Sequence, residues 1–137
     1  MVCIYCDSRT RVLNSRHQKR INRKWRRREC IICKAVFTSL ESIDFGGSIA
    51  VSSTKHLQPF HRDKLFISIY NSLKHRKTAL RDATELTDTI ISKLYSYMKN
   101  AILDKESIIF VSLQTLKRFD KVAAIHYEAF HPLSSTQ

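Results

Sequence analysis

The sequence contains very little glycine and proline, with two residues of each among 137. Both glycines lie within residues 44–48, so the chain has no glycine-rich loop of the kind that holds phosphates. It also lacks clustered carboxylates and any pairing of a nucleophile with a base. Its histidines are scattered along the chain: His17, His56, His61, His75, His126 and His131. These absences predict a protein that is not an enzyme.

Long apolar runs are absent as well. No stretch approaches the ~20 apolar residues that a membrane-spanning helix needs, so we expect no membrane segment. Met1 and Val2 lead directly into the first cysteine, which leaves no room for a signal peptide. Together these features predict a cytoplasmic protein, in a compartment where thiols stay reduced.

All the cysteines of the chain belong to two C-x-x-C pairs, Cys3 with Cys6 and Cys30 with Cys33. Two residues between cysteines allow one tight turn to direct two thiolates at the same ion, and two such turns complete a tetrahedral shell of four sulfurs. The 23 residues between the pairs fit a ribbon with its cysteine turns on successive hairpins. We expect one Zn²⁺ per chain; disulfide pairing and an iron centre of rubredoxin type are the alternatives.

Positive charge is concentrated in the cysteine-bearing part of the chain. The formal net charge is +12, and residues 1–37 alone hold eleven Lys and Arg against two acids, a net of +9. This asymmetry predicts binding to the phosphates of double-stranded DNA. The candidate contacts are Arg11, Arg16, Arg26, Arg27 and Arg28. A merely solvated basic surface and an RNA-binding zinc ribbon are the alternatives, and Trp25 is expected to pack within its own module more often than to stack on a base.

The pattern of the chain predicts an α+β protein with two domains. Residues 1–45 form a small all-β zinc ribbon, with strands at 10–13 and 33–38 and an exposed hairpin tip at 18–24. The two glycines mark the junction. Residues 48–133 form the second domain, in which a short hairpin with strands at 48–51 and 56–58 caps four helices.

The four helices are expected at about 61–74, at about 79–100, after Asp104 and after Asp120, with both aspartates as N-caps. Apolar residues at three- and four-residue steps predict which face of each helix is buried. These faces are Leu65, Ile69 and Leu73 in the first helix; Leu80, Ala83, Leu86, Ile90, Leu94 and Tyr97 in the second; Ile109, Leu113 and Leu116 in the third; and Val122, Ile125 and Ala129 in the fourth.

Several segments together resemble one family, the bacterial NrdR-type repressors of ribonucleotide reductase genes. In the first part the resemblance is carried by the leading C-x-x-C pair and by residues 12–16 (VLNSR), 26–33 (RRRECIIC) and 37–41 (FTSLE). In the second part, residues 59–65 (PFHRDKL) resemble the P-F-x-x-x-K-L segment of an ATP-cone. Residues 116–123 (LKRFDKVA) are similar to the entry to the last helix of that family, so the match covers nearly the whole chain.

This resemblance implies a zinc ribbon that contacts operator DNA, joined to an ATP-cone that senses ATP against dATP. It implies a bacterial, nucleoid-associated homo-oligomer that represses reductase transcription when deoxynucleotide is plentiful. The nucleotide-binding residues that it implies are Val51, Lys55, Phe60, Arg62, Lys64 and Arg76. Because ATP-cones also regulate reductases, an enzyme is the remaining alternative, and nucleotide hydrolysis by the pure protein would indicate it.

The chain departs from the family pattern mainly in the ATP-cone. Ser52 stands where the family usually has a lysine, Thr54 and Lys55 replace an acidic-glycine turn, His131 and Pro132 replace a tyrosine-arginine pair, and Asn14 replaces an aspartate in the ribbon. Lys55 is a possible substitute for the missing phosphate lysine. These departures concern the nucleotide site far more than the metal site.

Overall fold

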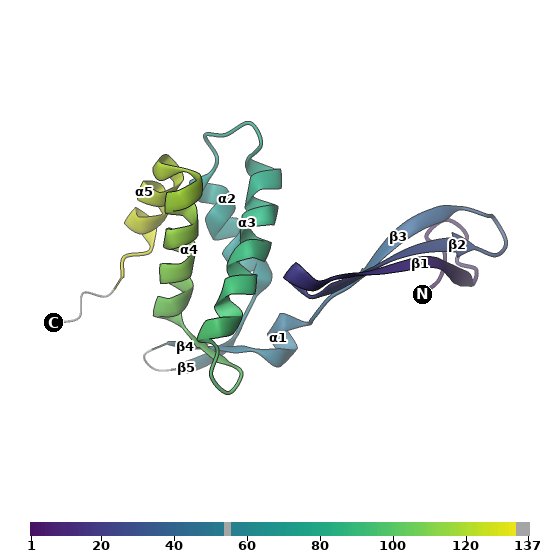
Figure 1. Cartoon of the computed structure of the whole chain (residues 1–137), viewed down its shortest axis with the longest axis horizontal. Helices are drawn as coiled ribbons and strands as arrows, with labels where there is room; N and C mark the ends of the chain where they lie inside the picture. The colour runs from purple at the N-terminus through teal and green to yellow at the C-terminus, as the bar shows by residue number, and fades with distance from the viewer. Residues whose placement is uncertain (54–55, 134–137) are drawn as a thin grey trace. The chain divides into compact units, whose positions relative to one another are not determined.

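The computed structural model describes residues 1–53 and 56–133, and it divides the chain into two compact units at Ile43 and Asp44. The first unit is a three-stranded antiparallel sheet, and the second combines a small mixed sheet with helices (Figure 1). The predicted α+β class is confirmed. Lys55, one of the predicted nucleotide contacts, lies outside the described residues.

The ribbon consists of β1 (Thr10–Gln18), β2 (Arg23–Cys30) and β3 (Val36–Glu41), in the order β1-β2-β3. A short 3-10 turn, η1 (Lys19–Ile21), joins β1 to β2, and Asn22 closes it with a φ of 47°, in the left-handed region that Asn tolerates. Strand β2 was not predicted, because a run of arginines has no alternation of apolar and polar residues. The last strand begins later than predicted, since residues 33–35 belong to the second cysteine turn.

The ribbon has almost no apolar core. Among residues 1–43, all of which the structure describes, the buried ones are Cys3, Cys30 and Ser39. A unit of this size with so little buried apolar surface cannot offset its loss of conformational entropy through hydrophobic burial. Its folding therefore depends on what the cysteines bind.

The second unit opens with α1 (Phe45–Ser48), one helical turn capped by Asp44, whose Oδ1 accepts from the Gly47 N–H at 3.2 Å. A Cβ on Gly47 would lie 2.8 Å from the Asp44 carboxylate, which explains a glycine here. The first strand of this unit, β4 (Ala50–Ser53), consequently begins two residues later than predicted.

The small sheet has the order β5-β4-β6. β5 (His56–Pro59) pairs with β4 in antiparallel fashion, whereas β6 (Ile102–Asp104) pairs with β4 in parallel. The predicted second helix through residue 100 is wrong at its end: α3 (Ala79–Leu94) passes into η2 (Tyr95–Tyr97), and the chain turns through Asn100 and Ala101 into β6. Strand β6 has only three residues, which is too short for a strand pattern to be recognised in the sequence.

The remaining helices are α2 (Arg62–Ser72), α4 (Lys105–Phe119) and α5 (Lys121–Phe130). Asp104 caps α4 by accepting from Ser107 N–H at 2.7 Å, and Asp120 caps α5 by accepting from Ala123 N–H at 3.0 Å. Both predicted N-caps are confirmed. In the described residues, no helix combines the length and apolar character that crossing a bilayer would require.

The predicted buried faces of α2 and α4 are confirmed, and the helices pack around Ile69, Leu73, Ile90, Leu94 and Leu116. In α3 the prediction extended too far at both ends, because Leu80 and Tyr97 are exposed.

The predicted face of α5 is wrong. Val122 is 60% and Ile125 is 69% exposed, whereas Ala123, Ala124 and Tyr127 are buried. Both sets have helical spacing, and the alanines allow α5 to approach its neighbours more closely than the larger Val and Ile would.

Candidate metal centre, basic ribbon and ligand cavities

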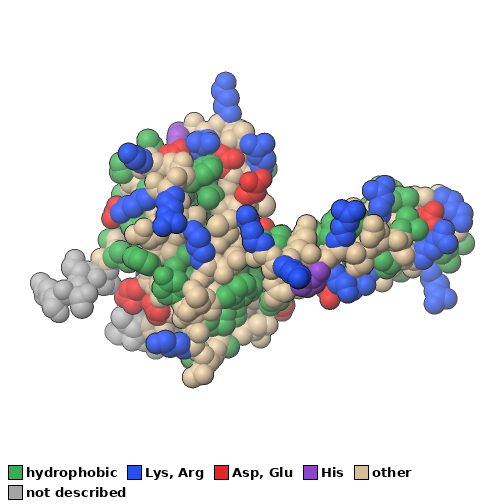
Figure 2. Space-filling model, in the orientation of Figure 1, with side chains coloured by type: hydrophobic (Ala, Val, Ile, Leu, Met, Phe, Trp, Pro, Cys, Tyr) green, Lys and Arg blue, Asp and Glu red, His purple; other side chains and the backbone are tan. Residues whose placement is uncertain are grey.

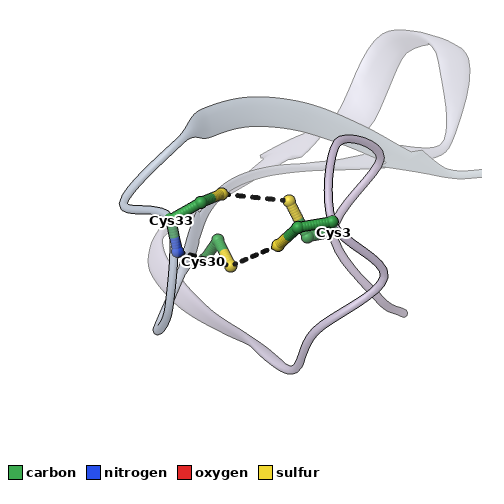
Figure 3. Close-up of side chains that lie close together, drawn as sticks. Cys3, Cys30 and Cys33 are labelled. Atoms are coloured by element: carbon green, nitrogen blue, oxygen red, sulfur yellow. Dashed lines mark hydrogen bonds between the residues drawn. The ribbon is translucent and has the colours of Figure 1, made fainter.

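The four cysteine sulfurs converge at one end of the ribbon (Figure 3). All four Sγ atoms lie within 4.8 Å of one another, with Cys3 to Cys33 at 3.6 Å and Cys6 to Cys30 at 3.5 Å. A Zn–S distance of about 2.3 Å in a tetrahedron requires sulfurs about 3.8 Å apart, so this set fits a zinc ion. The cysteines are free thiols, which argues against the disulfide alternative.

The two cysteine turns are built alike. In each, the backbone N–H of the first cysteine donates to the carbonyl of the residue five positions later: Cys3 N–H to Ser8 at 2.8 Å, and Cys30 N–H to Ala35 at 2.9 Å. The residue after each second cysteine has a positive φ, 58° in the first turn and 60° in the second. The repeated geometry places one pair of thiols opposite the other.

Backbone N–H groups also face the sulfurs. Tyr5 N–H donates to Cys3 Sγ at 3.4 Å, and Ile32 N–H donates to Cys30 Sγ at 3.4 Å. Such bonds stabilise thiolate over thiol, because a hydrogen bond to the charged form favours that form. The turns therefore prepare the sulfurs for a cation.

Without a cation, the closely spaced thiols oppose the ionisation of Cys33. Hydrogen bonds with the Ser8 side chain and backbone, and then with neighbouring cysteines, lower the pKa of Cys6 to about 6. For Cys33 the Ala35 backbone N–H lowers the pKa, but the adjoining cysteines together with desolvation outweigh it and raise the pKa to about 12. A divalent ion removes this conflict by offsetting the thiolate charges, and four thiolate donors suit zinc.

The arginines of the ribbon divide between its two faces. Successive residues of a strand point to opposite faces, so Arg27 shares a face with Trp25, and Arg26 shares the other with Arg28. Arg16 lies directly opposite Trp25 in the β1–β2 register and therefore joins its face. Figure 2 shows Lys and Arg side chains along the ribbon.

Three of the five predicted DNA contacts are held by bonds within the ribbon. Arg11 Nε donates to Glu29 at 2.6 Å, Arg26 Nη2 to Glu41 at 2.6 Å, and Arg28 Nε to Ser39 Oγ at 2.9 Å. The hydrogen bond from Arg26 holds the pKa of Glu41 below its ordinary value. Arg16 and Arg27 are exposed and, within residues 1–43, have no acidic partner. Trp25 is half-buried.

In the second unit, a cavity of about 240 Å³ lies between the hairpin and the helices. It brings together three of the predicted nucleotide contacts, Val51, Phe60 and Lys64. His61 and Tyr127 also line it, as do two side chains whose place the sequence did not reveal: Lys105 at the start of α4 and His131 after α5. Lys105 was not predicted because its place depends on strand β6, which was not predicted either. His131 was expected to be one of the scattered histidines and a departure from the family pattern, not part of a cavity.

Arg62 and Arg76 do not line this cavity. Arg62 donates to Asp88 at 2.7 Å. Arg76 bridges two carboxylates, Asp82 and Asp120, at 2.9 Å each, with its guanidinium 4.8 Å from the centre of the Phe119 ring.

A comparison with protein families matches residues 1–41 to the N-terminal zinc ribbon described as "Transcriptional repressor NrdR-like, N-terminal domain". Proteins named "Transcriptional repressor NrdR" are similar over 96% of this chain. That of Finegoldia magna is 31% identical over 132 residues, 87% of its length. Those of Chelativorans sp. and Symbiobacterium thermophilum are 30% and 29% identical and are covered over 85% and 87% of their lengths.

Proposed function

Because the chain belongs to the NrdR family of transcriptional repressors, we propose that it represses ribonucleotide reductase genes by binding their operator DNA through the ribbon, under the control of adenine nucleotides. The family is one of regulators, not of enzymes. The observation that carries the proposal is the four-cysteine cluster at the end of a strongly basic sheet, in a chain that matches these repressors over 96% of its length.

DNA binding is assigned to the face of the ribbon that carries Arg16, Trp25 and Arg27. Both arginines are exposed, and their charges are not offset by a carboxylate within the ribbon. They are therefore able to neutralise phosphates, and a guanidinium fork can also reach a guanine edge in a groove. Arg26 and Arg28 hold β2 to β3 on the opposite face and contribute chiefly to the shape of the sheet.

A single ribbon offers too little surface for specific recognition. Specific protein–DNA interfaces bury about 1,000–2,500 Å² of protein, and small single modules reach the lower end at most. Several copies held in register would multiply both affinity and specificity. We therefore propose a homo-oligomer whose subunits are arranged by the second unit.

Nucleotide sensing is assigned to the cavity lined by Val51, Phe60, Lys64 and Lys105. Its apolar wall suits a base and its two lysines suit phosphate. Zn²⁺ would hold the ribbon, and ATP and dATP would act as effectors. A nucleotide changes repression only if it binds one oligomeric arrangement of the protein more tightly than another.

The experiment that tests this function is a binding competition. Zinc-loaded protein is titrated onto a labelled duplex from a reductase promoter, in the presence of unlabelled promoter duplex, unrelated duplex or unrelated RNA. Repressor function predicts that promoter duplex competes most strongly. Stronger competition by RNA would instead support an RNA-binding zinc ribbon, and equal competition by all three would leave the ribbon without specificity and contradict the proposal.

A further inference from the structure

A second, larger hollow adjoins the cavity assigned to the nucleotide. It measures about 530 Å³ and lies between α2 and α5. Three residues, Lys64, Ser68 and His131, line both hollows, so the two share a wall. We call the larger one the α2–α5 groove.

The smaller cavity is too small for a complete nucleotide. Sites for ligands of this class commonly measure about 300–1,000 Å³, whereas this cavity measures about 240 Å³. Its walls include Val51, Phe60, Ile108 and Ile109, which suit a base, and its two lysines can meet only part of a phosphate chain. A triphosphate must therefore extend beyond it.

The α2–α5 groove has the chemistry that a phosphate chain requires. Its cationic and titratable lining residues are Lys64, Lys74, His126 and His131, and Ser68, Asn71 and Ser72 add neutral hydrogen-bonding groups. None of the described residues that line it is acidic. Lys64 lies in the first turn of α2, and Lys74 lies two residues after the helix ends. The helix rises about 12 Å from Lys64 to Ser72, so the cations are spread along the groove and not gathered at one point.

His131 lies at the boundary between the two hollows. Its Nε2 is 2.5 Å from Ser68 Oγ, and its ring lies 4.5 Å from the ring of Tyr127. Burial, together with the charge of Lys105, holds the pKa of His131 below its ordinary value, so at neutral pH it is an uncharged hydrogen-bonding group. Because His131 lines both hollows, a ligand that extends from one into the other can contact this side chain.

We propose that the α2–α5 groove is the polyphosphate subsite of this chain: the nucleoside occupies the smaller cavity, and the phosphates run past Ser68 and His131 towards Lys74 and His126. This rests on the proposed nucleotide sensing. The groove would also supply the cations for the phosphates. These are needed because position 52, on β4, holds a serine where the resembling family usually has a lysine.

The test is calorimetric titration of the full-length, zinc-loaded protein with adenosine, AMP, ADP, ATP and inorganic tripolyphosphate. The variants are Lys74→Gln and His126→Gln, with Lys74→Arg to restore the charge. Lys77→Gln is the matched control, since Lys77 is an exposed lysine three residues away that does not line the groove. Unfolding temperatures show that each variant is folded.

We expect the affinity for adenine nucleotides to rise with the number of phosphates. Lys74→Gln should weaken ATP binding roughly tenfold, as the loss of a charged hydrogen bond does, and leave the affinity for AMP unchanged. Lys74→Arg and Lys77→Gln should bind ATP as the unchanged protein does. If ATP binds equally to all variants, the groove proposal is overturned and nucleotide sensing stands. If no adenine nucleotide binds, nucleotide sensing fails. Binding of tripolyphosphate that is abolished by Lys74→Gln would then still support an anion subsite in the groove. If tripolyphosphate does not bind either, the groove proposal is overturned as well.

Discussion

Arg27 and Arg28 are neighbours in the sequence, but their side chains leave opposite faces of β2. Arg27 is exposed on the face that carries Trp25, whereas Arg28 donates to the buried Ser39 at 2.9 Å. A three-arginine run therefore does not form one continuous surface. A duplex that lies against one face of the ribbon contacts either Arg27 or its two neighbours, not all three.

Substitution of the arginines should show which face of the ribbon binds DNA. Arg27→Ala and Arg16→Ala should each weaken operator binding and reduce the slope of log affinity against log salt by about one, because each removes one phosphate contact. Arg26→Ala and Arg28→Ala should leave that slope unchanged. Fluorescence anisotropy at several salt concentrations measures it. Equal slope changes in all four variants would contradict the assignment of the faces.

Removal of the metal should unfold the ribbon and leave the helical unit folded. The ribbon has few buried residues apart from its cysteines, and zinc binding supplies about 10–16 kcal/mol in comparable peptides. Cys30→Ser or chelation should therefore abolish the dispersed amide signals of residues 1–43 in an NMR spectrum, while those of the core around Ile69 and Leu116 persist. Zinc added back should restore the chelated protein but not the variant. Retained ribbon signals after verified metal loss would contradict this.

Asp120 should contribute to stability in a pH-dependent manner. The backbone N–H of Ala123, followed by hydrogen bonds from His75 and Arg76, lowers the pKa of Asp120 from 3.8 to about 2. Because the pKa is depressed in the folded state, the contribution is complete above about pH 4 and is lost as pH falls towards 2. Asp120→Asn keeps a capping oxygen and should remove this dependence, whereas Asp120→Ala should cost about 1 kcal/mol more at pH 7 for the lost cap.

Denaturant unfolding of the three proteins at several pH values measures these contributions. The difference in unfolding free energy between the unchanged protein and Asp120→Asn should shrink from pH 5 to pH 2. A difference that is constant over this range would show that the carboxylate charge does not stabilise the fold.

Lys64 and Arg76 should behave differently although both were predicted nucleotide contacts. Lys64→Gln should weaken ATP binding with little change in unfolding temperature, since Lys64 is exposed and lines both hollows. Arg76→Gln should lower the unfolding temperature, because it leaves the carboxylates of Asp82 and Asp120 without their shared partner. Calorimetry and thermal unfolding of both variants separate the roles. An Arg76 variant of normal stability that has lost ATP binding would restore Arg76 to the nucleotide site.

The metal centre could be predicted from the sequence because its information is local. Spacing alone placed Cys3, Cys6, Cys30 and Cys33 around one ion, and the two caps Asp104 and Asp120 follow from their positions before apolar periodic segments. The buried faces of α2 and α4 were equally clear, since each has one apolar face.

The features that were missed depend on contacts between distant segments. β6 is a strand because three residues pair with β4, some fifty positions earlier, and nothing in those three residues requires it. The pairing of Arg76 with Asp120 spans 44 residues. It depends on how α2 and α5 pack, because Arg76 follows α2 and Asp120 precedes α5. In α5, two apolar faces compete, and packing against the other helices selects the alanines over Val122 and Ile125.

The most direct test of the account is a titration of zinc-loaded protein onto a reductase-promoter duplex with ATP, with dATP, with both and with neither, followed by fluorescence anisotropy. Nucleotide-controlled repression predicts tighter binding with dATP than with ATP, and a midpoint that shifts with their ratio. Four superimposable curves, or no binding of the duplex under any of the four conditions, would contradict it.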